Sequence, residues 1–229
     1  MNGSPRILGF DTSGAHCAVA VRPGGAAPGF EEMKRGQAER LIPMCSEALA
    51  ASGIGYGDLE AIAVGIGPGN FTGVRIAVSA ARGLALSLGI PAIGVSGFEW
   101  LHQGLDRSGP VMISLPAPQD RAYVQTFRNR VTLGPPALLV PGSRLTELDQ
   151  PNLLVAGYRA RDIAQGFDAA WDEDVWNDHR PDRMAAAIAE IAAHKLAVAE
   201  GVWDERPSPL YIRPADAAPA SDPPPVILP

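Results

Sequence analysis

The sequence has little cysteine and no long hydrophobic run. Only Cys17 and Cys45 occur among its 229 residues. Two thiols are too few for a disulfide framework, so we expect both to be buried free thiols. No uncharged apolar run reaches about 18 residues, and residues 1–9 lack the basic start, apolar core and cleavage site of a secretory signal. We therefore expect a cytoplasmic protein that does not span a membrane.

Basic surface is also scarce. The formal net charge is −6 and the isoelectric point is near 5.2. A protein of this charge is repelled by bare nucleic acid unless a local basic patch compensates. The densest basic stretch, residues 121–130, follows Asp120 and is interpreted as a solvated strand face. Direct contact with nucleic acid is therefore not expected.

The sequence also lacks pairs of His or Cys residues at the spacing that local metal sites use. The four histidines are His16, His102, His179 and His194, and none has a second His or a Cys three or four residues away in a predicted helix. Zinc and iron sites usually draw on such local pairs. We therefore predict no metal and no cofactor, and we interpret the acidic cluster of residues 172–174 as a solvated loop.

The first hundred residues predict a β-meander followed by alternating helices and strands. Residues 11–14 form a turn short enough to make the first two strands a hairpin. Apolar residues at helical spacing then alternate with short continuous apolar runs, which are typical of buried parallel strands. The predicted strands are residues 6–10, 17–21, 29–34, 61–66 and 92–95, and the predicted helices are 38–51 and 71–88, with a short helix after residue 95.

This order predicts an α/β fold of the actin/sugar-kinase type with two lobes and a mixed sheet, since a plain doubly wound fold would not begin with a hairpin. Residues 1–104 are predicted as the first lobe and 105–214 as a smaller second lobe. Residues 215–229 are a proline-rich tail that we expect to be at least partly disordered. The second part is predicted to hold strands at 111–115, 123–127 and 153–156 and an alanine-rich helix at 182–200.

A glycine-rich loop, residues 67–73, follows a predicted strand and opens a helix. Backbone N–H groups and the helix dipole attract anions in that setting. The loop lacks the Lys-Ser or Lys-Thr of a Walker loop and misses the dinucleotide fingerprint by one residue of spacing. The phosphate-loop candidates are Gly67 and Gly69 with Asp11 and Thr12, although phosphate transfer needs a second acidic loop that does not recur. Alternatively, the glycines permit a tight turn with close packing.

The helix of residues 71–88 is apolar around most of its circumference. At about 100° per residue, Arg75, Ser79 and Arg82 share one narrow stripe. Docking on a sheet buries only one side of a helix, so a second covering surface is expected, either the second lobe or another protein. Together with the preceding helix it predicts a partner-binding face. Its residues are Leu41, Met44, Cys45 and Ala48 from the first helix and Ile76, Ala77, Ala80, Gly83 and Leu84 from the second.

Six short segments of the sequence form a recognisable set: Phe10–Ser13, Glu39–Met44, Gly67–Ile76, Ala81–Ala85, Gly89–Pro91 and Pro209–Arg213. Together they resemble the TsaB (YeaZ) family, and the resemblance is dense over residues 7–101. It implies an actin-like two-lobed fold and a role as the inactive relative of TsaD, the subunit that transfers a threonylcarbamoyl group to the adenosine beside the tRNA anticodon.

The resemblance also implies partners. It implies pairing with TsaD through the two helices, self-pairing in the absence of TsaD, docking of the ATPase TsaE on that pair, and tRNA contact only through partners. The sequence departs from the family pattern at Gln37, where His is usual, and at Pro116 and Pro118, where an Asp-Ala-Arg strand end is usual. The alternative is an enzyme, either a nucleotide-dependent phosphotransferase that uses Asp11 and the Gly67 loop or a glycopeptidase.

Overall fold

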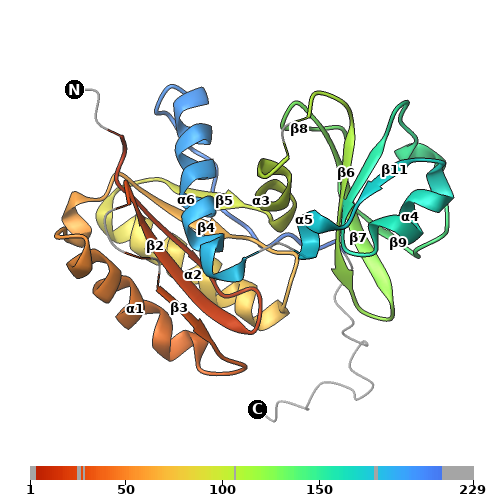
Figure 1. The fold of residues 1–229 in the computed structure, drawn as a ribbon. Coiled ribbons are helices and arrows are strands. Elements are labelled where there is room, and N and C mark those ends of the chain that lie inside the picture. Colours follow the sequence, from red (N-terminus) through yellow and green to blue (C-terminus); the bar gives the residue numbers. More distant parts are fainter. Residues whose placement is uncertain (1–3, 25–26, 28, 106, 178–179, 213–229) are drawn as a thin grey trace, which may run out of the picture.

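The computed structural model describes residues 4–24, 27, 29–105, 107–177 and 180–212. Two β-sheets form the centres of two lobes that lie side by side (Figure 1). The first sheet has the strand order β3-β2-β1-β4-β5, and the second has the order β11-β10-β6-β7-β8 with β9 also paired to β7. The predicted tail, residues 215–229, lies outside the described residues.

The first sheet begins as the predicted meander. Strand β1 pairs antiparallel with β2, and β2 pairs antiparallel with β3. Strands β4 and β5 then add in parallel beside β1. The apolar runs of β1 and β4 are buried throughout because helices cover both faces of the sheet. The strands are β1 (Ile7–Asp11), β2 (His16–Arg22), β3 (Gly29–Glu32), β4 (Ala61–Gly65) and β5 (Ala92–Val95).

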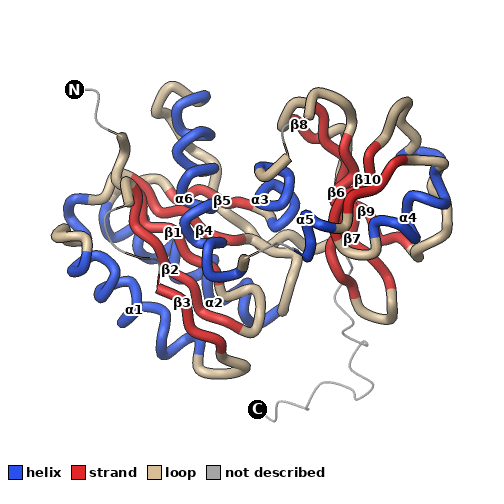
Figure 2. The backbone as a smooth tube through the Cα atoms, viewed as in Figure 1, coloured by secondary structure: helices blue, strands red, loops and turns tan. Residues whose placement is uncertain are grey.

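Two helices cover one face of this sheet and a third covers the other (Figures 1 and 2). Helix α1 (Gln37–Ala51) packs mainly on β2, and α2 (Phe71–Leu88) packs mainly on β4. Asn70 caps α2 by accepting a hydrogen bond from the Gly73 N–H, which is the usual role of Asn at this position. Gly89 ends α2 with a φ of 67°. A 3-10 turn (Tyr56–Asp58) joins α1 to β4.

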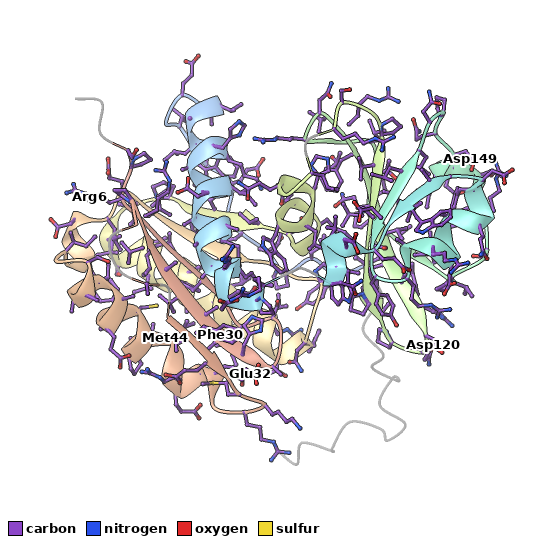
Figure 3. The ribbon with its side chains drawn as sticks, viewed as in Figure 1. Arg6, Phe30, Glu32, Met44, Asp120 and Asp149 are labelled. Carbon is purple, nitrogen blue, oxygen red and sulfur yellow. The ribbon has the colours of Figure 1, made fainter. Side chains whose placement is uncertain are left out.

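The core of the first lobe lies between the sheet and α1 and α2. Phe10 and Leu41 are almost wholly buried there, and Met44 lies between α1 and the strands (Figure 3). Both cysteines are buried free thiols. Burial raises the pKa of Cys17 to about 11 and that of Cys45 to about 12.

The second lobe contains the three predicted strands and several elements that the sequence did not predict. Its core joins Met112 and Val124 of the sheet to Ile163 and Phe167 of a short helix. Asp120 and Asp149 lie at its surface (Figure 3). The elements are β6 (Val111–Ala117), β7 (Arg121–Arg128), β8 (Val131–Thr132), β9 (Ala137–Leu139), a 3-10 turn (Thr146–Leu148), β10 (Leu154–Gly157), α4 (Ala160–Phe167), β11 (Ala170–Asp172) and α5 (Asp174–Asn177).

The alanine-rich helix corrects the predicted lobe boundaries. Helix α6 (Pro181–Val198) forms as expected, but it packs on β1, β2 and β4 of the first lobe and not within residues 105–214. Its small residues allow this close approach, and Gly9 is required there because a Cβ would lie 2.6 Å from the Ala185 carbonyl oxygen. The first lobe therefore comprises residues from both ends of the described chain. Helix α3 (Gly97–Gln103) packs on β6 and α6 and so links the two lobes.

Helix α2 is the one described helix that is long and apolar enough to cross a membrane, with a mean hydropathy of 1.2. In the structure its Val74, Ala77, Val78 and Ala81 side is buried against the sheet. A core helix passes the same composition test, and this burial is what the α/β architecture requires of α2. The predicted two-lobed α/β fold, with a mixed sheet that begins as a three-stranded meander, is confirmed.

Candidate functional site

The glycine loop is packed against the turn between β1 and β2. The Asn70 N–H donates to the Ser13 carbonyl oxygen at 2.7 Å, and the Thr12 hydroxyl donates to the Gly73 carbonyl oxygen at 2.7 Å. A Cβ on Gly69 would lie 2.5 Å from the Ser13 oxygen, and one on Gly73 would collide with the Thr12 oxygen. These glycines permit close backbone packing, which favours the packing interpretation over the phosphate-loop one.

Asp11 forms its hydrogen bonds within the same turn. Its side chain is buried, and Oδ1 accepts hydrogen bonds from the Ser13 N–H and the Ser13 hydroxyl, both at 2.8 Å. His16 Nε2 lies 2.9 Å from the same oxygen, and the His16 ring packs on Phe30. The predicted candidates Asp11, Thr12, Gly67 and Gly69 do come together, but as a closed hydrogen-bonded turn. Within the described residues, no group of three or more His, Cys, Asp or Glu side chains could hold a metal ion.

The acidic cluster has a structural role. Asp172 Oδ1 accepts hydrogen bonds from the backbone N–H groups of Asp174 and Val175, and so caps α5. Glu173 accepts one from the Arg161 N–H. His194 is exposed on α6, as a surface or interhelix histidine would be. The bonds given for Asp172 and Glu173 lie within the second lobe and do not involve the turn at Asp11.

The predicted partner-binding face must be narrowed. Leu41, Met44, Cys45 and Ala77 are each at most 3% exposed and form the core beneath α1 and α2. Residues buried in this way cannot contact a partner while the lobe keeps its fold. Most of the apolar residues of α2 therefore pack on the sheet, and only those at the edge of this apolar side could contact a second surface.

That margin is a stripe of small and aliphatic residues. Ile76, Ala80 and Leu84 are half-buried, as is Ala48 of α1, and Gly83 is exposed. At about 100° per residue, Ile76, Ala80 and Gly83 fall on one side of α2. We call these three residues, together with Ile42 of α1, the helix seam.

Ile42 belongs to the seam although the spacing of the other apolar residues of α1 did not single it out. Its side chain is 42% exposed next to Pro43. The sequence could have indicated this, because Ile42 is apolar but lies outside the helical stripe of residues that face the core. Helices α1 and α2 lie on the same side of the first sheet (Figure 1) and are in contact with each other.

The opposite side of α2 is covered by the end of the described chain. The Leu210 N–H donates to the Ile66 carbonyl oxygen at 2.8 Å. Arg75 Nε donates to the Tyr211 hydroxyl at 2.8 Å, and the Arg75 guanidinium lies 3.6 Å from the centre of the Phe71 ring. This clasp lies at the first turn of α2, and further along the helix Gly83 of the seam is exposed, as is Leu86, which is 83% exposed.

The start of α1 is tied to β3. Arg40 forms ion pairs with Glu31 and Glu47 at 2.6 and 2.7 Å, and these hydrogen bonds lower the pKa of both carboxyl groups. Gln37, where the sequence departs from the family pattern, donates from Nε2 to the Met33 carbonyl oxygen at 3.1 Å. Pro116, the other departure, is exposed near the end of β6 and lies outside the seam.

A family model described as "TsaD: tRNA N6-adenosine threonylcarbamoyltransferase" matches residues 15–131. The chain is 43% identical over 100 residues to the Escherichia coli (strain K12) tRNA threonylcarbamoyladenosine biosynthesis protein TsaB, a match that covers 43% of each chain. It is 35% identical over 130 residues to the protein of the same description from Haemophilus influenzae, covering 55% of each. The aligned part thus spans about half the length of these curated relatives.

Three further matches cover more of the chain. An uncharacterised protein from Mycobacterium bovis is 30% identical over 189 residues, which is 81% of this chain and 79% of the relative. The solved structure of YeaZ from Pseudomonas aeruginosa superposes with a TM-score of 0.69 at 28% identity, covering 90% of this chain and 99% of that one. A second Pseudomonas aeruginosa structure, described as similar to peptidase YEAZ, has a TM-score of 0.71 at 27% identity over 91% of this chain and all of that one.

Proposed function

Since this chain belongs to the TsaB (YeaZ) branch of the TsaD family, we propose that it is a non-catalytic scaffold and activator that pairs with a TsaD-like catalytic subunit. In that role it supports threonylcarbamoylation of the adenosine next to the tRNA anticodon. The curated relatives carry the name of this biosynthesis in their descriptions. We propose that this chain acts in the same biosynthesis, as the subunit that activates the catalytic partner.

The helix seam is the single observation that carries the proposal. Ile42 and Gly83 are exposed, and Ala80 is half-buried between them and the core. Small residues on an exposed helix side let another helix approach closely, as they do in tightly packed helix pairs. Each Ile or Leu that becomes fully buried at such an interface contributes roughly 1.5 to 3 kcal/mol. A four-helix contact between two related lobes would use this side of α1 and α2.

The same face accounts for self-pairing, and further partners would join the heterodimer. In the absence of a TsaD-like protein, two copies of this chain would pair through the seam as a homodimer, because an isologous interface needs only one self-complementary patch. A TsaE-like ATPase would dock on the heterodimer. The net charge of −6 favours tRNA binding mainly through the partners. We propose that these associations take place in the cytoplasm.

No observation favours the enzymatic alternative. A phosphotransferase needs a carboxylate and backbone donors that face an open phosphate site. Here Asp11 accepts hydrogen bonds from Ser13, and the Asn70 N–H is occupied by the Ser13 carbonyl. The described residues therefore support a scaffold better than a phosphate-transferring or peptide-cleaving centre.

The direct test is reconstitution. The chain, a TsaD-like protein and a TsaE-like protein from the same cells are purified separately and combined with tRNA and an activated threonylcarbamoyl donor. The proposal predicts modified adenosine only when all three proteins are present, and co-elution of this chain with the TsaD-like protein in gel filtration. Full modification without this chain would contradict the proposal.

A further inference from the structure

A groove lies beside the C-terminal end of α2 in the first lobe. Its volume of about 500 Å³ falls within the range of about 300 to 1,000 Å³ that binding clefts occupy. It is formed by the end of α2, the start of β5 and residues 203–207, which follow α6 in the chain. The apolar residues that line it are Ala85, Leu86, Ile90, Pro91, Trp203 and Pro207.

Leu86 is the most exposed apolar residue of this groove. At 83% it is also more exposed than any other large apolar residue that the structure describes. Ile90 and Trp203 line the same groove and are only partly buried. Apolar residues that gather at one exposed place are typical of an interaction surface. The groove is therefore a candidate for occupation by an apolar segment.

The charges around the groove do not favour an ion. The lining contains two basic residues, Arg82 and Arg206, and two acidic residues, Asp204 and Glu205. Their formal charges cancel, and all four residues are exposed, so that solvent screens them. An ion gains little from such a lining, whereas apolar side chains gain from leaving water.

The chain itself contains an apolar segment beyond its described part. Residues 213–229 lie outside the described residues. Residues 213–225 contain no Val, Ile, Leu, Met or aromatic residue, and Val226, Ile227 and Leu228 then follow one another. The large apolar side chains after Ile212 are thus gathered in one short segment.

The length of chain between Ile212 and Val226 is sufficient to reach the groove. Arg75 Nε donates to the Tyr211 hydroxyl, so the described chain ends beside the first turn of α2. From Arg75 to Leu86 the helix rises about 16 Å. The chain from Ile212 to Val226 can span at most about 45 Å. Val226 can therefore reach the groove without an extended connection.

Charge and connectivity also favour docking on this helix. Helix α2 carries Arg75 and Arg82 and no acidic residue, whereas residues 213–225 carry Asp216 and Asp222 and a single basic residue. Because the tail is covalently joined to the lobe, docking is intramolecular, and short connections give effective concentrations on the order of millimolar. A weak apolar contact is then sufficient.

We propose that residues 226–228 dock in this groove of their own chain. Their side chains cover Leu86 and pack between the end of α2 and Trp203, and residues 213–225 follow the exposed side of α2 from its first turn. The docked segment contacts both α2 and residues 203–207, and so holds the chain that follows α6 against α2.

The test is a spin-label measurement on the full chain. Ser221→Cys places an accessible thiol in the tail, and the two native thiols are buried and so react slowly in the folded state. A nitroxide on this thiol should broaden the amide signals of residues 82–90 and 203–206 in ¹H–¹⁵N spectra, and reduction of the nitroxide should restore them. Absence of this broadening, or stronger broadening at another surface, would overturn the proposal.

A variant of the tail tests whether its apolar residues make the contact. The combined substitutions Val226→Ser, Ile227→Ser and Leu228→Ser lie outside both described lobes, so these lobes should fold as before. In the spin-labelled Ser221→Cys background they should abolish the broadening at residues 82–90. Equal broadening with and without the three substitutions would show that the apolar residues do not dock.

A variant of the groove tests the other side of the contact. Leu86→Glu adds a charge to the apolar lining at an exposed position and should also abolish the broadening. The matched control is Val131→Glu, which makes the same kind of change at a 65% exposed residue of β8 in the second lobe. It should leave the broadening unchanged. Equal effects of the two substitutions would contradict docking in the groove.

A mixture of chains separates docking within one chain from docking on a second copy. Spin-labelled chain at natural isotope abundance is mixed with an equal amount of ¹⁵N-labelled chain that carries no nitroxide. The proposal predicts no broadening at residues 82–90 of the ¹⁵N-labelled chain. Broadening there would show that the tail docks on a second copy and would contradict the proposal.

Discussion

Asp11 and His16 form a buried pair across the turn between β1 and β2, with 2.9 Å between Oδ1 and Nε2. The same carboxylate oxygen accepts two hydrogen bonds from Ser13. In an actin-like lobe this turn is the place where a phosphate-binding loop would be expected, and here its acidic group is satisfied from within the chain. Because Asp11 bonds to Ser13 and His16, it is not free to bind a phosphate, and the same bonds stabilise the first lobe.

Replacing Asp11 by Ala should therefore affect folding. It removes the acceptor of three hydrogen bonds and leaves the buried His16 without its partner. We expect the free energy of unfolding in urea to fall by about 1 to 3 kcal/mol or more. Asp204→Ala at an exposed position is the control and should cost less. An unchanged unfolding midpoint for the Asp11 variant would contradict the structural role of the pair.

Nucleotide binding gives a second prediction. Isothermal calorimetry with ATP and magnesium should show no micromolar binding by the isolated chain, since Asp11 and the Asn70 N–H are already bonded. Tight binding that Asp11→Asn abolishes would instead support the phosphotransferase alternative.

Two glycines of α2 should respond in opposite directions to the same substitution. A Cβ at Gly83 meets no atom within 4 Å, so Gly83→Ala should stabilise the helix by roughly 0.5 to 1 kcal/mol. A Cβ at Gly73 collides with the Thr12 carbonyl, so Gly73→Ala should be strongly destabilising. Thermal melts of the two variants beside the wild-type chain measure both effects. Equal shifts in the same direction would refute the close packing of the loop on the turn.

The buried thiols predict a dependence of stability on alkaline pH. Burial raises the pKa of Cys45 from 9.0 to about 12, so the folded state keeps the thiol proton after the unfolded chain has released it. The resulting contribution to stability is complete below pH 9.0 and is lost as the pH rises from 9.0 towards 12. The unfolding free energies of the wild-type chain and Cys45→Ala should therefore converge in this range. At pH 8 the native thiols should react slowly with a thiol reagent and rapidly once the chain is unfolded.

The first lobe could be predicted well because its signals are local. Helix α2 has the predicted bounds, and the meander and strands β4 and β5 lie within a residue or two of prediction. Turn residues, capping groups and apolar runs specify such elements without reference to distant contacts. The elements α4 and β11 were missed because they are short, and Gly166 interrupts the helical pattern.

Tertiary placement could not be predicted in the same way. The periodicity of α6 shows which residues share a side, but not that this side packs on the first sheet. The same limit applies to Leu41 and Met44: spacing placed them on an apolar stripe, and only the fold shows that the sheet covers it. Ile42 and Gly83 define the seam because the fold leaves them exposed.

Substitution of Gly83 by a long charged residue tests the central claim, that the helix seam binds the partner, most directly. Gly83→Arg adds a long charged side chain where the chain's own fold leaves open space, so the lobe should stay folded and its circular dichroism spectrum should remain native. The control is Ala197→Arg, an exposed residue of α6 on the other face of the sheet.

The measurement is gel filtration of each variant with a TsaD-like protein. The helix-seam account predicts loss of the complex for Gly83→Arg and full complex formation for the wild-type chain and Ala197→Arg. Retention of the complex by a folded Gly83→Arg variant would contradict it.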